Sequence, residues 1–257
     1  LKYCYIPDHS SIYKNINKVA PGTIFTFSSP SITPEIHIFW SLQEVIEKTR
    51  IKRNIDTHDS LEEKSLQLEE LLLEVIADQM ISDVPLGSFL SGGIDSSLVT
   101  ALMQSISSLP VKTFSIGFKE SAYNESKEAR EVAAYLKTDH QEFLITEEEA
   151  LEVIKELPRI YDEPFADSSQ IPTLLLCRHA RKEVKVALTG DGGDEIFGGY
   201  NRYLFAPKAW SIVSKLPIRL RKKISSISNF VHYIGGSENS FFRTIIGLVG
   251  LPGSTLD

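Results

Sequence analysis

The sequence has little cysteine, methionine or tryptophan, with two of each in 257 residues. Cys4 and Cys177 are too few for a disulfide framework, and the apolar run around Cys177 favours a buried thiol. No apolar run approaches the roughly 20 residues of a membrane span, and the first residues do not resemble a signal peptide. We therefore expect a cytoplasmic protein without a membrane segment.

Positive charge is also in short supply, with 27 Lys and Arg against 34 Asp and Glu and a formal net charge of −7. This balance argues against a nucleic-acid surface, and the basic run at 219–223 is interpreted as the solvated side of a helix. The histidines have no paired spacing, so we expect no zinc site, and His140 is interpreted as the start of a strand. The length and the 42% hydrophobic content indicate one large soluble domain or two smaller ones.

The sequence contains one stretch typical of an anion site. Residues 84–90 predict an apolar strand, residues 91–97 read Ser-Gly-Gly-Ile-Asp-Ser-Ser, and helix-forming residues follow at once. Glycine lets the backbone approach a ligand, and the first N–H groups of a helix attract anions. Additional hydroxyl donors are expected from Ser91, Ser96 and Ser97. An ordinary turn before a capped helix is the alternative interpretation.

Neither common phosphate motif is present in this stretch. A Walker A loop needs Gly-Lys-Ser/Thr, and the dinucleotide fingerprint needs G-x-G-x-x-G. The 91–97 loop instead suits pyrophosphate that is released as a leaving group. Asp95 is placed to bind the metal that accompanies the pyrophosphate.

Strands and helices are predicted to alternate over most of the chain. Strands are expected at 84–90, 111–118, 140–145 and 184–188. Helices are expected at 60–80, after the 91–97 loop, and at 125–137, 147–157 and 169–182. Such alternation predicts an α/β fold with a parallel sheet covered by helices on both faces. Ligands of such sheets bind beyond the carboxyl ends of the strands.

The first 60 residues have a different character. Residues 23–27 and 36–40 predict two strands, which are too few for an independent sheet, so we interpret 1–42 as the tail of a β-rich domain. Residues 43–59 are polar with little apolar period and are interpreted as a linker. The third predicted part is 60–257. Because the chain opens on Leu1 rather than Met, we expect it to be a piece of a longer protein.

A second glycine-rich loop, Thr-Gly-Asp-Gly-Gly-Asp-Glu, occupies residues 189–195 and is followed by Ile-Phe-Gly-Gly-Tyr. Its three carboxylates predict a bound cation, and Mg²⁺ takes one or two carboxylates together with substrate phosphates. Asp95 with either Asp191 or Asp194 would bracket such an ion. The spacing of a Ca²⁺ loop is absent, and a solvated acidic turn is the alternative.

A third loop at 161–169, Tyr-Asp-Glu-Pro-Phe-Ala-Asp-Ser-Ser, combines aromatic rings, carboxylates and a helix cap. It could read a small zwitterion. The alternative is a capping segment with a hydrophobic staple.

With these loops in view, a family resemblance can be named. Residues 91–96 resemble the pyrophosphate loop (PP-loop) of the ATP-pyrophosphatase group. Residues 188–200 resemble the second signature of class B glutamine-dependent asparagine synthetases. The resemblance also covers 113–118, 125–140 and 161–169, and 19–40 resembles the end of that family's glutaminase domain. It implies an adenine nucleotide α-hydrolase-like fold, with a synthetase domain that continues beyond Asp257.

The resemblance implies a ligase of asparagine biosynthesis. ATP would adenylate the side-chain carboxylate of aspartate, and ammonia drawn from glutamine would displace AMP. Implied Mg²⁺ ligands are Asp95 and Asp194. Implied ATP contacts are Ser91, Gly92, Gly93 and Ser96 at pyrophosphate, and Phe89, Ile116, Thr189 and Gly190 at the nucleoside. Asp191 falls where well-known members carry a Glu suggested as the base for ammonia. Implied partners are aspartate, ATP, ammonia and a glutaminase domain in the same full-length chain, and a homodimer stays open.

Two alternatives remain at this point. A β-lactam synthetase-like relative would use another acid and an internal amine, and a non-catalytic module would only bind ATP. The resemblance also shows departures. The family's glutaminase nucleophile is an N-terminal Cys, which Cys4 cannot be, and a Lys that steadies the adenylate is expected beyond Asp257. The 257-residue piece alone is therefore expected to be inactive.

Overall fold

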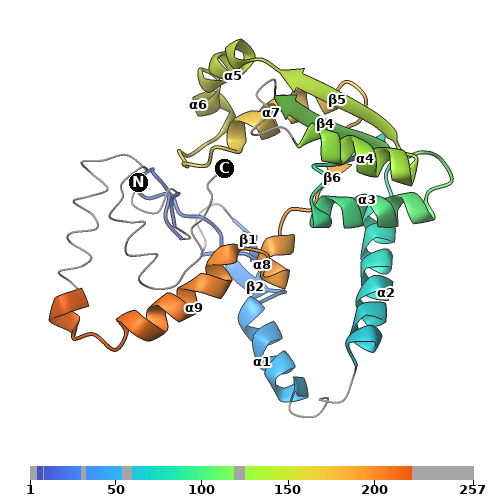
Figure 1. The fold of residues 1–257 in the computed structure, drawn as a ribbon. Helices are drawn as coiled ribbons and strands as arrows, with labels where there is room; N and C mark the ends of the chain where they lie inside the picture. The colour runs from blue at the N-terminus through green and yellow to red at the C-terminus, as the bar shows by residue number, and fades with distance from the viewer. Residues whose placement is uncertain (1–4, 8, 30–32, 54–59, 119–124, 222–257) are drawn as a thin grey trace. The chain divides into compact units, whose positions relative to one another are not determined.

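The computed structural model describes residues 5–7, 9–29, 33–53, 60–118 and 125–221 (Figure 1). The chain forms two compact units, Leu1–Thr189 and Gly190–Asp257. The predicted boundaries at residues 42 and 59 stay predictions, and Cys4 lies outside the described residues. In the part of the chain that is described, no helix has the length and apolar character needed to cross a membrane.

A parallel sheet lies at the centre of the first unit. Its four strands are β3 (Leu86–Phe89), β4 (Lys112–Phe118), β5 (Asp139–Ile145) and β6 (Val186–Leu188). They lie side by side in the order β5-β4-β3-β6, and all three pairings are parallel. Ser88 pairs with Leu188 and Phe89 with Phe114. The predicted parallel α/β fold is confirmed, and β3 is an inner strand with β4 and β6 on its two sides.

Helices cover both faces of this sheet (Figure 1). On one side lie α3 (Ile94–Ile106) and α4 (Ser126–Leu136), with α2 (Leu61–Gln79) packed against α3. On the other side lie α5 (Glu147–Ile154), α6 (Leu157–Ile160) and α7 (Gln170–Ala180). Core residues include Leu90, Leu102, Met103, Phe114, Ala129, Ile145, Val153, Leu175 and Ala180. Alternate residues of each strand thus face opposite helical layers.

The sequence predicts an environment for the side chains of Cys177 and His140. Cys177 is exposed on α7, so the predicted burial of its thiol is wrong. The helix turns Leu175 and Ala180 inward instead, and both are buried. His140 lies near the start of β5, as predicted, with its ring nitrogens 2.9 Å from Thr113 Oγ1 and 3.2 Å from Ser115 Oγ. Burial lowers the pKa of His140.

The first 53 residues form a small antiparallel sheet and a helix. The two predicted strands are present as β1 (Thr23–Thr26) and β2 (Glu35–Ile38), and they pair with each other. Helix α1 (Leu42–Arg53) occupies most of the segment predicted to be a linker, and residues 54–59 of that segment lie outside the described part of the chain. Its Glu, Lys, Arg and Gln residues form helices well without an apolar stripe. Contacts one turn apart support it, including Gln43 Nε2 to Glu47 Oε1 at 2.8 Å.

The second unit contains α8 (Gly193–Phe197) and α9 (Asn201–Val213). Helix α9 carries Pro207 inside it. Of the basic run at 219–223, residues 222 and 223 lie outside the described part of the chain.

Candidate active site

The first glycine-rich loop leaves the sheet at the carboxyl end of β3. Leu90 is only 1% exposed and anchors the strand end, while its N–H donates to Phe114 O at 2.9 Å. Gly92 then adopts a φ of +83°, and a Cβ added there would lie 2.8 Å from Ala129 N. A larger residue would meet both backbone strain and a rigid neighbour. The loop is therefore held against the first turns of α4.

The serines of this loop form a polar cluster at the start of α3. Ser96 Oγ lies 2.9 Å from Ser91 Oγ and 3.2 Å from Gly93 O, and it accepts a hydrogen bond from Ser91 N–H at 3.2 Å. Gly93 N–H donates to Ser91 Oγ at 3.2 Å. Gly93 is the N-cap of α3 and offers no side-chain cap, so the first N–H groups of this 13-residue helix point to the same place as the hydroxyls.

One predicted member of this cluster does not join it. Ser97 Oγ is buried and has no hydrogen-bond partner among the described residues. At helical spacing, consecutive residues point about 100° apart, so the Ser97 side chain leaves the helix in a different direction from that of Ser96. The Ser97 hydroxyl thus lies outside the cluster that Ser91 and Ser96 form, and its role as a donor to an anion stays a prediction. Asp95, in the first turn of α3, is half-buried.

The other predicted residues of the first unit lie at neighbouring strand ends. Phe89 ends β3, Ile116 lies in β4, and Thr189 follows β6. The side chains of Phe89 and Ile116 pack into the apolar clusters beneath α7 and α5. A nucleotide at this edge of the sheet would therefore meet the backbone of these residues more than their side chains.

The second loop belongs to the second unit and is shaped by its own glycines. Gly192 is the N-cap of α8 with a φ of +92°, and Gly198 ends that helix with a φ of +71°. Asp194 is half-buried on α8, and its carbonyl accepts a hydrogen bond from Gly199 N–H at 3.0 Å. A Cβ added at Gly199 would lie 1.8 Å from Asp194 Oδ1. The direction of the Asp194 carboxylate therefore depends on a glycine at position 199.

The remaining carboxylates of this loop differ from each other. Tyr200 Oη donates to Glu195 Oε1 at 2.7 Å, so this carboxylate has a partner within the loop. Asp191 is exposed. Gly190 O accepts a hydrogen bond from Gly193 N–H at 3.3 Å, which closes the turn between them.

The carboxylates of the two loops suit a metal ion that takes only some of its ligands from the protein. Across the described ranges, no three histidine, cysteine, aspartate or glutamate side chains gather in a way that could hold a metal. A protein cage is thus not indicated, whereas one or two carboxylates completed by phosphate oxygens fit the habit of Mg²⁺. Asp95 and Asp194 lie in separate units, and their sharing of one ion stays a prediction.

The loop at 161–169 has a defined conformation between α6 and α7. The rings of Tyr161 and Phe165 meet edge to face with centroids 4.8 Å apart. Asp167 Oδ1 accepts a hydrogen bond from Ser169 N–H at 2.8 Å, and hydrogen bonds from Ser169 lower the pKa of Asp167. Ser169 is the N-cap of α7 but makes no side-chain cap itself. The predicted capping thus takes the form of a turn closed by Asp167.

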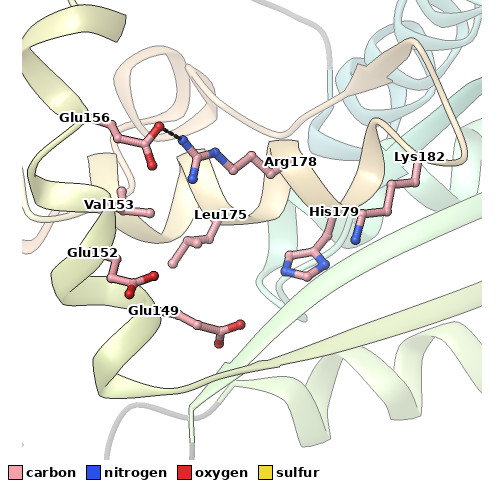
Figure 2. Close-up of a pocket in the computed structure, with 8 residues that line it drawn as sticks. All are labelled: Glu149, Glu152, Val153, Glu156, Leu175, Arg178, His179 and Lys182. Atoms are coloured by element: carbon pink, nitrogen blue, oxygen red, sulfur yellow. Dashed lines mark hydrogen bonds and ion pairs between the residues drawn. The ribbon is translucent and has the colours of Figure 1, made fainter.

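Sequence reasoning missed a hollow of about 320 Å³ between α5 and α7 (Figure 2). Carboxylates line it from α5 and from just after its end, and cationic side chains and a histidine line it from α7 and from just after its end. Its lining residues are Glu149, Glu152, Val153, Glu156, Leu175, Arg178, His179 and Lys182. Arg178 donates to Glu156 across it. Glutamates at helical spacing on α5 were its one signal, but none of the predicted site residues lines this hollow.

The fold and the first loop together define a class of protein. A parallel α/β sheet that presents a glycine and serine loop at a helix N-terminus, beyond the carboxyl ends of its strands, is the architecture typical of phosphate- and nucleotide-binding domains. The chain belongs to the asparagine synthase family, which its residues 67–246 match.

Curated relatives agree with this assignment. The chain is 37% identical over 236 residues to a putative asparagine synthetase [glutamine-hydrolyzing] 2 of Methanocaldococcus jannaschii, covering 88% of this chain and 43% of that protein. It is 34% identical over 232 residues to asparagine synthetase [glutamine-hydrolyzing] 1 of Bacillus subtilis, covering 89% of this chain and 34% of that protein. The chain thus spans less than half the length of these relatives.

Solved structures with partial likeness include an NH3-dependent NAD synthetase from Campylobacter jejuni, at 16% identity and a TM-score of 0.38. That match covers 53% of this chain and 60% of the other. A glutamine-dependent NAD+ synthetase from Acinetobacter baumannii matches at 21% identity and a TM-score of 0.40, covering 56% of this chain and 29% of the other.

Proposed function

We propose that this chain is the amide-forming part of a glutamine-dependent asparagine synthetase. The observation that carries the proposal is the cluster of Ser91, Gly93 and Ser96 at the N-terminus of α3, in a loop without lysine. Backbone N–H groups and hydroxyls can hold an anion by themselves. They do so without the lysine with which a Walker A loop holds the β- and γ-phosphates. Pyrophosphate leaving from ATP is such an anion.

The chemistry needs two steps. First, an oxygen of the aspartate side-chain carboxylate attacks the α-phosphorus of ATP, and the bond from that phosphorus to the bridging oxygen breaks, which releases pyrophosphate. Next, ammonia attacks the activated carbonyl carbon, one proton is lost, and the carbon–oxygen bond to AMP breaks. An ionised carboxylate is a poor electrophile, so the first step supplies the leaving group that amidation requires.

Residues of this chain take the following proposed roles. Ser91, Gly92, Gly93 and Ser96 would hold the pyrophosphate oxygens, and Asp95 and Asp194 would hold Mg²⁺. When bound, the ion would offset the charge of the phosphates. The backbone at Phe89, Ile116, Thr189 and Gly190 would contact the nucleoside. Asp191 would accept the proton from the attacking ammonia, although its side chain is one methylene shorter than a glutamate.

The proposal extends to organisation and surroundings. Residues 1–42 would be the end of a glutaminase domain, 43–59 its connection, and 60–257 the beginning of the synthetase domain. The relatives' names include glutamine hydrolysis, and their greater length leaves room for such a domain. Ammonia would come from glutamine within the same full-length protein, in the cytoplasm, and we leave a homodimer open.

The test uses the full-length protein with ATP labelled in its α-phosphate, Mg²⁺, ammonia and one acid at a time. We expect AMP and pyrophosphate to form with aspartate, together with asparagine. Formation of ADP and phosphate would exclude the proposed chemistry. AMP formation with another acid, or with an internal amine, would keep adenylation but reassign the acceptor to a relative such as a β-lactam synthetase.

A further inference from the structure

Glu163, in the middle of the 161–169 loop, is held by a segment about 150 positions earlier in the chain. Lys18 Nζ lies 2.5 Å from Glu163 Oε2, and Ile12 N–H donates to Glu163 Oε1 at 3.1 Å. Both carboxylate oxygens are therefore engaged by the same upstream segment. The two segments also line a common hollow of about 550 Å³. It is lined by Ser11, Tyr13, Ile16, Asn17, Lys18, Tyr161, Asp162 and Glu163.

The upstream segment has internal bonds that support this contact. Lys18 Nζ also donates to Ile6 O at 3.1 Å. The Lys18 ammonium thus joins Glu163 to a backbone carbonyl twelve residues before Lys18. Tyr13 N–H donates to Ser11 Oγ at 3.0 Å, which closes a turn around Ile12. The position from which Ile12 meets Glu163 is thus defined by local bonding.

The ion pair is better shielded than most surface pairs. The side chain of Lys18 is 38% exposed and that of Glu163 only 18% exposed. The hydrogen bond from Lys18 lowers the pKa of Glu163, against the opposing effect of desolvation. Glu163 therefore stays ionised and paired at neutral pH, with one oxygen engaged by Lys18 and the other by Ile12.

The loop has fixed ends, because α6 ends at Ile160 and α7 begins at Gln170. Its second half is closed by Asp167 and by Gln170 Nε2, which donates to Asp167 O at 2.8 Å. The Glu163 contact adds a fixed point in the first half. A loop that is ordered before its ligand arrives loses less entropy on binding, so such a contact improves affinity without touching the ligand.

We propose that Glu163 is a positioning residue that sets the 161–169 loop to receive the acceptor amino acid, and that Lys18 acts through it. This inference rests on the proposed function and on the interpretation of 161–169 as the loop that reads the acid. It assigns Ile12 and Lys18 an indirect influence on acid recognition, exerted through Glu163. Loosening the contact removes binding energy from ground state and transition state alike, so KM for the acid rises while kcat holds.

The kinetic test uses Glu163→Gln, Lys18→Met and Lys18→Arg in the full-length protein, with aspartate and ATP varied separately. We expect KM for aspartate to rise about threefold to tenfold in Glu163→Gln and about threefold in Lys18→Met. KM for ATP and kcat stay unchanged. Lys18→Arg keeps the charge and donors and should behave as the unsubstituted protein. The matched control is Glu183→Gln, which breaks the Lys112–Glu183 pair of 2.6 Å at the start of β4 and should change neither KM.

A double variant, Lys18→Met with Glu163→Gln, separates positioning from general stability. If Lys18 acts through Glu163, the double variant has the KM of Glu163→Gln alone. Independent, multiplying effects would overturn the inference, as would an unchanged KM for aspartate in Glu163→Gln or an equal rise in Glu183→Gln. An unsubstituted protein that forms no AMP with any acid would instead remove the proposed function, and this inference with it.

The contact itself has a test that does not depend on activity. A water-soluble carbodiimide joins a carboxylate and an amine in contact into an amide, with loss of water. We expect a Lys18–Glu163 cross-link by mass spectrometry, a Lys112–Glu183 cross-link as positive control, and loss of only the first in Lys18→Arg. Absence of the first link while the second forms would contradict the proposed contact.

Discussion

The two glycine-rich loops carry similar residues but obtain their shape in different ways. Gly92 and Gly192 both have a positive φ, +83° and +92°. A side chain at Gly92 would run into the backbone of α4, whereas a Cβ at Gly192 would have no neighbour within 4 Å. The first loop is therefore shaped by packing against the sheet unit, and the second by its own backbone conformation and internal bonds. Similar composition does not imply similar sensitivity to change.

The largest expected effect tests whether both loops serve one ion. On the proposed function, Asp95→Asn and Asp194→Asn in the full-length protein each lower Mg²⁺-dependent exchange of pyrophosphate into ATP by about a hundredfold or more. Both side chains lie in loops or first turns, so the fold should survive, as circular dichroism would verify. Asp83→Asn, an exposed carboxylate outside both loops, is the control. Normal exchange in either variant would remove that residue from the metal site.

The next largest effect compares the two loops directly, through the stability of the variants Gly92→Ala and Gly192→Ala. The alanine at 92 adds a backbone clash to the strain of a left-handed residue, and we expect unfolding free energy to fall by about 2–4 kcal/mol. At 192 only the strain remains, about 1 kcal/mol. Chemical denaturation of the two variants measures both values. Equal losses would mean that packing against α4 does not shape the first loop.

A smaller effect separates two adjacent serines. Ser96→Ala removes the hydroxyl at the centre of the loop cluster and should lower pyrophosphate exchange about tenfold, the cost of one or two hydrogen bonds to an anion. Ser97→Ala should leave exchange unchanged and raise stability by about 0.5–1 kcal/mol, because it removes a buried hydroxyl without a partner. A loss of exchange in Ser97→Ala comparable with that in Ser96→Ala would place Ser97 in the site after all.

The smallest effect concerns the sheet away from both loops. Burial lowers the pKa of His140 in the folded state, so the unfolded chain binds the proton more tightly. Stability should therefore rise with pH through the window just below the ordinary histidine pKa of about 6.5, and fall as the pH drops through it. Comparing urea midpoints at pH 7.5 and 5.5 for the unsubstituted chain and His140→Gln measures this contribution. The variant should lose less stability on acidification, and an identical loss in both would contradict it.

The parts of this molecule that sequence reasoning predicted are those with local causes. Alternating hydrophobicity and turn residues place β3, β4 and the loop at Gly92, because these features depend on neighbours in sequence. Helix α1 was missed because it rests on propensity and pairs one turn apart rather than on an apolar stripe. Ser97 lies outside the hydroxyl cluster although it is next to Ser96 in sequence, because its direction is set by helical phase at the loop–helix junction. The Lys18–Glu163 contact joins residues that no local pattern relates.

Helix α1 also has a mechanical consequence. Its 12 residues span about 18 Å as a helix, and a flexible coil of that length would have a mean end-to-end distance of nearly the same size. The helix therefore leaves the average separation of its two ends almost unchanged and removes the fluctuation around it. It also resists bending and twisting, which a coil does not. A change in direction at residue 42 would thus reach residue 53 as a rotation of a rigid rod rather than being lost in the chain.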